Sequence, residues 1–353
     1  MRTRALAVLL LLGTPVTGEE LSPVALGRID AHAHLFAEAR PVLDLLDRSN
    51  LVAVNVCVVD RYDKGYETVA PQHAMARHLA ELTRRLPWIA TFDDAGFADT
   101  GFARGALAEV DRALAQGAIG VKVYKSIGME LRSASGAYVL PDDPAFEPVF
   151  AGLEARGTTV YGHIAEPIAA WLPLDPKNPD YDYYRTNPAW HVHGRPGVPT
   201  KEAILAARDR LLERHPRLRF VGCHLGSMEE DVDAIARRFD RYPGFAVDTA
   251  GRVVHLMQQP RGKVRAFLLR YPDRVLYGTD LAFLPGQDPV ETGMRFEREY
   301  ARDWAYFATG ETLEVDGWKV EGLALPAPVL RQVFRENALR WVPGLAAAPP
   351  FRP

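Results

Sequence analysis

The sequence has little cysteine, no excess of basic residues and no long apolar run beyond its first residues. Only Cys57 and Cys223 occur among 353 residues, and both lie in short apolar runs typical of buried strands. We therefore expect buried free thiols, although one disulfide between them stays open in an oxidising compartment. The formal net charge of −3 indicates no basic surface for nucleic acid. No later stretch is apolar enough to predict a membrane span or anchor.

The first 18 residues have the order of a secretory signal peptide. Basic Arg2 and Arg4 precede the apolar run Ala5–Leu12, and small residues follow before Glu19. This order predicts cleavage after Gly18 and export to the periplasm or the exterior. The alternative is an N-terminal strand or helix of the core, which this order of residues favours less.

The remaining chain alternates short apolar runs with stretches of helical period. Ala106–Gln116, Lys201–His215 and Met228–Phe239 are examples of the helical patterns. This alternation predicts an α/β fold with a parallel sheet, and eight such units match a closed (β/α)8 TIM barrel. A doubly wound open sheet is the alternative, because periodicity does not show closure. The predicted strands are Gly27–His34, Leu51–Val59, Trp88–Asp93, Ile119–Lys125, Thr158–Ile164, Leu218–His224, Phe245–Thr249 and Arg274–Asp280.

Some segments depart from the repeat. Trp171–Thr200 follows the fifth strand and is rich in Pro, Tyr, Asn and Asp, which predicts an irregular insertion on the active-site side. Val290–Tyr306 should be helical, and Pro326–Trp341 is the expected closing helix. One barrel domain would thus span residues 19–341. The proline-rich residues 342–353 are expected to form a disordered tail.

Histidines and an aspartate stand where several predicted strands end. His32 and His34 lie two residues apart in the string DAHAH, so both should project from one face of the first strand. His163, His224 and Asp280 end the fifth, sixth and eighth strands. The carboxyl ends of barrel strands are where catalytic groups meet, so these five side chains could share one cation. Packed or solvated histidines at strand ends are the alternative.

With these residues the chain resembles the amidohydrolase superfamily, in particular the amidohydrolase-2 group that includes aminocarboxymuconate-semialdehyde decarboxylase. The resemblance runs from DAHAH to the string VFRENAL at residues 333–339, which is similar to that group's terminal motif. It implies that His224 is the general base or oxyanion stabiliser. It also implies one divalent metal ion held by His32, His34, His163 and Asp280. Zinc is expected from these ligand types, and manganese, iron or cobalt also suit them.

Lys122, in the fourth predicted strand, allows a second metal ion. The local string GVKVYK is similar to binuclear relatives, in which a modified lysine bridges two ions, and also to mononuclear members. The alternative is an unmodified lysine that contacts substrate or pairs with Glu166.

Four polar residues near strand ends are candidates for binding substrate: Glu166, Asp248, Arg252 and Arg61. Glu166 could instead orient a metal ligand. Either arginine could hold a substrate carboxylate or form a surface ion pair. As a lid, the aromatic insertion would suit a ring-shaped substrate. Its string His191-Val192-His193 repeats the spacing of the first pair without a carboxylate nearby.

These features predict an exported hydrolase that uses metal-activated water to cleave a C–N or C–O bond of a small molecule, such as an amide, ester or lactone. A nonoxidative decarboxylase of a small carboxylic acid would use the same ligands and is the main alternative. A barrel that binds metal or ligand without turnover is another, although His224 and Asp280 argue against it. The expected partner is a small-molecule substrate, and a homo-oligomer is compatible with the sequence.

Overall fold

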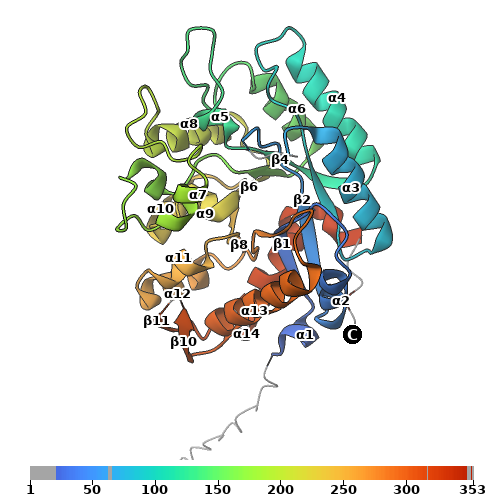
Figure 1. Ribbon diagram of the computed structural model, residues 1–353, viewed down its shortest axis with the longest axis vertical. Coiled ribbons are helices and arrows are strands. Elements are labelled where there is room, and N and C mark those ends of the chain that lie inside the picture. Colours follow the sequence, from blue (N-terminus) through green and yellow to red (C-terminus); the bar gives the residue numbers. More distant parts are fainter. Residues whose placement is uncertain (1–20, 63–65, 316, 348–350, 352–353) are drawn as a thin grey trace, which may run out of the picture.

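In the computed structural model, helices lie around a set of central parallel strands (Figure 1). The structure describes residues 21–62, 66–315, 317–347 and 351. The predicted signal peptide, residues 1–18, lies outside these described residues. No helix in the described part of the chain has the length and apolar character needed to cross a membrane.

The sheet closes into a barrel through an eighth strand that is split in two. Strands β1 to β8 pair in parallel in chain order, and β9, soon after β8, pairs in parallel with β1. Bonds from Ala31 N to Tyr277 O (2.8 Å) and from Asp280 N to His32 O (2.7 Å) continue this seam. The fold is therefore an α/β TIM barrel, as predicted. The strands are β1 (Arg28–Leu35), β2 (Leu51–Val56), β3 (Trp88–Thr91), β4 (Ala118–Val123), β5 (Val160–Gly162), β6 (Phe220–Gly222), β7 (Phe245–Asp248), β8 (Val275–Leu276) and β9 (Leu281–Phe283).

Helices follow most strands on the outside of the barrel, and an antiparallel hairpin of β10 (Thr312–Val315) and β11 (Trp318–Glu321) is added near its end. The predicted insertion is not wholly irregular, because it contains the short helix α7. The helices are α1 (Pro23–Leu26), α2 (Arg40–Arg48), α3 (Val69–Leu82), α4 (Phe102–Ala115), α5 (Ser126–Met129), α6 (Glu147–Arg156), α7 (Tyr181–Thr186), α8 (Lys201–Arg214), α9 (Cys223–Ser227), α10 (Val232–Arg241), α11 (Val253–Met257), α12 (Arg261–Arg270), α13 (Pro289–Ala308), α14 (Ala327–Arg331) and α15 (Asn337–Trp341), with a π turn at Gln332–Glu336 and 3₁₀ turns at Ile168–Trp171 and Pro343–Ala347.

Apolar side chains fill the barrel interior below the strand ends that carry the histidines. Ile29, Val54 and Tyr161 are fully buried there and belong to one hydrophobic cluster. Val342 and Leu345 join this cluster and are also fully buried. The expected disorder is therefore wrong at the start of the tail, because Val342 and Leu345 pack into the base of the barrel. Cys57 and Cys223 are buried free thiols, as expected.

Gly162 ends β5 immediately before His163, at a point with no room for a side chain. A Cβ at Gly162 would lie 2.0 Å from Cζ of Phe220 on β6. The close contact between these two strands therefore requires glycine at this position, and it fixes the start of the loop that carries His163.

We predict that Gly162→Ala will lower the free energy of unfolding by about 1–3 kcal/mol, because the ring of Phe220 must move within a packed interior. Gly105→Ala is the matched control. Gly105 lies inside α4, and an added Cβ there meets no atom within 4 Å. This control should be stabilising by about 0.5–1 kcal/mol. Denaturant unfolding of both variants tests the claim, and equal effects would contradict it.

Candidate metal centre

Five side chains meet at the carboxyl end of the barrel. His32 and His34 project from β1, His163 follows β5, His224 follows β6, and Asp280 lies between β8 and β9. Oδ1 of Asp280 is 3.2 Å from Nε2 of His34 and 3.6 Å from Nε2 of His32. Oδ2 of Asp280 is 3.9 Å from Nδ1 of His224. The parallel direction of the strands brings these residues to one end, as the sequence predicts.

Hydrogen bonds at Nδ1 fix the orientation of three imidazoles. Nδ1 of His32 lies 2.8 Å from Oδ2 of Asp248. Nδ1 of His34 lies 2.6 Å from the carbonyl oxygen of Val56, and Nδ1 of His224 lies 2.8 Å from that of Ala250. Because these oxygens are acceptors, each Nδ1 carries the proton and each neutral ring keeps its lone pair at Nε2.

The Nε2 lone pairs of His32 and His34 therefore face an oxygen of Asp280 that also has only lone pairs to offer. Nζ of Lys122, 3.2 Å from Nε2 of His32, supplies one donor to these acceptors, and a cation between His34 and Asp280 would stabilise the others. Nε2 of His163 is also buried and has no hydrogen-bond partner in the structure. A divalent cation would satisfy all of these atoms, so the residues present fit a metal ion.

Burial also favours the neutral imidazoles of His32, His163 and His224, and the neutral form is the one that binds metals. Desolvation lowers the pKa of His32 and holds the pKa of His163 well below its usual value. Desolvation lowers the pKa of His224 to about 3, although the nearby Asp280 opposes this shift.

The groups of neighbouring ligand atoms differ from the predicted ligand set. In the described residues, atoms of His32, His224 and Asp280 all lie within 4.8 Å of one another, and so do atoms of His32, Cys223 and Asp248. Neither group includes His34 or His163. The rings of His163 and His224 are nevertheless neighbours, with centroids 4.2 Å apart. Both histidines are therefore placed where they could act on one cation.

The backbone is strained at two of these residues. His224, Leu225 and Ser227 have φ between +57° and +59°, and Asp280 has φ of +64°. Residues other than glycine are uncommon in the left-handed region, Leu225 and Ser227 more so than His or Asp, and such strain is concentrated at functional sites. The α9 segment is thus a left-handed turn that presents His224 to the site.

Asp248, a candidate for binding substrate in the sequence, is fully buried and is not among the residues that line the cavity. Its side chain is fully buried, with Oδ2 at His32 and Oδ1 accepting from the backbone N–H groups of His224 (2.7 Å) and Ala250 (3.2 Å). It instead positions His32 and the strained turn at His224.

We predict that Asp248→Asn will weaken metal binding about 10–100-fold, because a neutral amide holds the His32 ring less firmly. Competition with a chelating metal indicator measures this change. Asp93→Asn is the control, because Asp93 is largely exposed and should leave the affinity unchanged. An unchanged affinity in Asp248→Asn would refute the orienting role.

The two buried lysines at the end of β4, Lys122 and Lys125, have different partners. Nζ of Lys122 lies 3.2 Å from Nε2 of His32 and 3.3 Å from Sγ of Cys223. Glu166 pairs with Lys125 rather than with Lys122, and its other oxygen accepts from the hydroxyl of Tyr184 at 2.8 Å. Lys122 points toward the histidines, so the alternative in which it pairs with Glu166 is wrong.

The two candidate arginines do not line the cavity. Arg61 forms ion pairs with Asp93, Asp94 and Glu130, which occupy its guanidinium. Nη1 of Arg252 donates to the carbonyl oxygen of Gly251 at 2.8 Å.

The second histidine pair, His191 and His193, forms hydrogen bonds with the backbone of the insertion. The rings of His191 and His193 bond to the carbonyl oxygens of Leu172 and Trp171, at 2.9 and 2.8 Å. Those bonds give both histidines a structural role in holding the insertion.

A cavity of about 580 Å³ opens above the histidines, within the usual size range of small-molecule sites. The insertion covers part of it, as expected of a lid. The lining residues are His34, Phe36, Val58, Asp60, Tyr62, Tyr66, Lys122, Tyr124, Lys125, His163, Tyr183, Thr186, Asn187, Pro188, Ala189, Trp190, His224, Asp280, Ala282 and Leu284.

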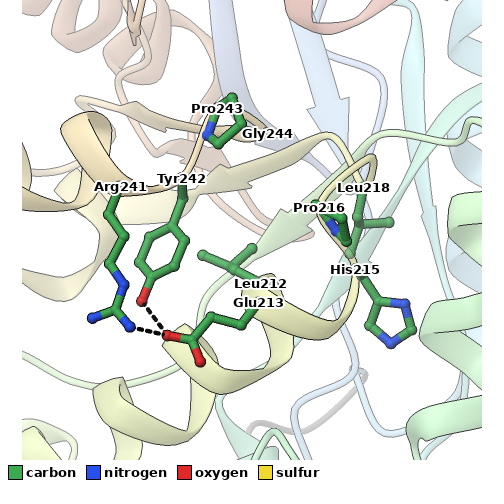
Figure 2. A pocket seen from close by; sticks show the side chains of 9 residues that line it. All are labelled: Leu212, Glu213, His215, Pro216, Leu218, Arg241, Tyr242, Pro243 and Gly244. Atoms are coloured by element: carbon green, nitrogen blue, oxygen red, sulfur yellow. Dashed lines mark hydrogen bonds and ion pairs between the residues drawn. The ribbon is translucent and has the colours of Figure 1, made fainter.

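A smaller depression of about 220 Å³ lies at the opposite end of β6 and β7 (Figure 2). In it, one oxygen of Glu213 contacts both Arg241 and the hydroxyl of Tyr242. Residues at the amino-terminal face of a barrel serve stability, and this depression contains none of the predicted site residues.

Sequence patterns did not single out Asp60, Tyr124 or Lys125, although all three line the cavity. Lys125 stands three residues beyond Lys122, just after β4 ends. Its position just after a strand is the one sequence feature that could have indicated a site residue, but lysines at such positions are usually solvated.

The chain belongs to the amidohydrolase family, whose sequence profile matches residues 29–344. This family is metal-dependent. No curated protein sequence matches the chain significantly.

Solved structures share the barrel at low sequence identity. The 2,6-dihydroxybenzoate decarboxylase from Rhizobium is 16% identical with a TM-score of 0.53, over 90% of this chain and 98% of that one. A dihydroxybenzoic acid decarboxylase from Polaromonas sp. JS666, with bound manganese and the inhibitor 2-nitroresorcinol, is 15% identical with a TM-score of 0.51, over 90% and 97%. At these identities the likeness shows the fold.

Proposed function

We propose that the protein is a metal-dependent hydrolase that cleaves a C–N or C–O bond of a small, ring-bearing molecule. The observation that carries the proposal is the meeting of the His32 and His34 Nε2 atoms at one oxygen of Asp280, on the floor of the cavity. We further propose that it acts after export, which the order of residues at the N-terminus supports.

His32, His34, His163 and Asp280 would hold one divalent ion, with zinc as the preferred metal. When bound, this ion would acidify water and polarise the carbonyl to be cleaved. Lys122 lies beside His32, but we propose that it stays unmodified and that the site holds a single ion.

His224 would move the proton. Its Nδ1 donates to the carbonyl oxygen of Ala250, so Nε2 keeps a lone pair. That nitrogen can accept a proton from water and return it to the leaving group. Asp248 anchors the backbone of His224 at 2.7 Å and so holds the base in position.

The walls of the cavity suit a flat ring. Phe36, Tyr62, Tyr66, Tyr124 and Trp190 line it, and aromatic side chains favour stacked or edge-on contact with another ring. Trp190 packs edge-on against Tyr62 and Tyr124, with centroids 5.1 and 5.7 Å away. The lid thus contributes a wall as well as a cover.

Nonoxidative decarboxylation of a ring-bearing acid is the second candidate. The same ligands would serve it, and the cationic Lys122 and Lys125 in the cavity wall would suit an acidic substrate. The dihydroxybenzoate decarboxylases that share the barrel are proteins that carry out this chemistry.

Two variants should separate the role of a ligand from that of a base. His163→Ala should bind well below one metal equivalent, because it removes a ligand. His224→Ala should keep about one equivalent and lose about 10²–10⁴ in rate, as expected for a missing general base. Elemental analysis and turnover on the same samples measure both effects. The reverse pattern, with metal lost only in His224→Ala, would show that the two roles are exchanged.

The products of the reaction distinguish hydrolysis from decarboxylation. Purified protein should hydrolyse members of a panel of aryl esters, lactones and anilides, and a chelator should abolish that turnover. Release of CO2 from hydroxybenzoates without any hydrolysis would favour the decarboxylase instead. Turnover that survives complete metal removal would contradict both candidates.

A further inference from the structure

Lys125 is a buried cation in the wall of the cavity. It follows β4, and its side chain is only 3% exposed although it lines the cavity. Among the described residues that line the cavity, Lys122 and Lys125 are the only lysines, and none is an arginine. Lys122 lies beside His32, whereas Lys125 lies beside the lid residue Trp190.

The contacts of Lys125 leave part of its hydrogen-bonding capacity unused. An ammonium group has three N–H donors. Oε1 of Glu166 accepts one of them, and the other oxygen of Glu166 is bound by Tyr184. The rings of Trp190 and Tyr124, at 4.1 and 5.3 Å from Nζ, attract the charge without accepting a conventional hydrogen bond.

The other carboxylate of this wall is already engaged. Oδ2 of Asp60 accepts from the hydroxyl of Tyr124 at 2.7 Å, and Oδ1 accepts from the backbone N–H of Tyr62 at 2.9 Å. Each oxygen of Asp60 thus already accepts a hydrogen bond, and no ion pair between Asp60 and Lys125 is formed among the described residues.

We propose that Lys125 is a specificity-determining residue that binds an oxyanion, such as a carboxylate, on the part of the substrate that does not react at the metal centre. The preferred ligands are then flat molecules with two polar ends, one for the histidine group and one for Lys125. This inference rests on the proposed function, because it takes the histidine group as the reacting end.

The test compares two probes of nearly equal shape, isophthalate and 3-carbamoylbenzoate. Each has one carboxylate for the metal, but only isophthalate has a second negative charge. Calorimetry on the zinc-loaded full chain should show that isophthalate binds about tenfold or more tightly, as expected for a charge-assisted hydrogen bond. Lys125→Met should abolish this preference, whereas Lys125→Arg should retain most of it.

Glu166→Gln should change the preference for isophthalate in the opposite direction from Lys125→Met. It removes the competing negative charge while its amide oxygen can still accept from Tyr184, so the preference for isophthalate should increase. Lys177→Met, at an exposed lysine of the insertion, is the matched control and should change nothing. If Lys125→Met fails to fold with Glu166 left unpaired, the double variant Lys125→Met/Glu166→Gln replaces it.

The role of Lys125 would be refuted if the preference for isophthalate persisted in Lys125→Met. It would also be refuted if the wild type showed no such preference. Metal content and turnover are measured on the same samples, so the two proposals can fail separately. A wild type that shows the preference but cleaves nothing would refute the proposed function alone. An active enzyme that binds both probes equally would refute the role of Lys125 alone.

Discussion

Two imidazole nitrogens and one carboxylate oxygen face one another at the centre of this molecule. Nε2 of His34 is 3.2 Å from Oδ1 of Asp280, and Nε2 of His32 is 3.6 Å from the same atom. Because Asp248 and Val56 fix the protons on the opposite nitrogens, neither ring can turn a donor toward that oxygen without losing a buried hydrogen bond. The site therefore favours a positive charge at that point, and the proposed chemistry depends on it.

The segment that closes the barrel also brings Asp280 into the site. The chain leaves β7 through β8, turns at Asp280 in the left-handed region and then joins β1 through β9. Asp280 N bonds to the carbonyl oxygen of His32, so the residue that completes the ring of strands is also held against the first histidine. Strain at Asp280 and His224 is tolerated because the packed strands on both sides determine their conformation.

Strand periodicity predicted the eight-stranded barrel and the end of the barrel at which His32, His34, His163, His224 and Asp280 gather. Each of those residues ends a strand pattern, and parallel strands place such ends together. Contacts that depend on side-chain direction could not be predicted in this way. Sequence spacing does not show that Asp248 turns inward to His32. It also does not show that Arg61 forms ion pairs with three carboxylates, or that Glu166 pairs with Lys125. The burial of Val342 and Leu345 was missed because a short proline-rich tail resembles a disordered one.

The most direct test of the account is the position of the metal itself. Crystals of the protein loaded with zinc or manganese should give one anomalous scattering peak per chain, about 2.0–2.2 Å from Nε2 of His32, from Nε2 of His34 and from an oxygen of Asp280. A peak bound instead between Cys223 and Asp248, or no peak near Asp280 at full loading, would contradict it.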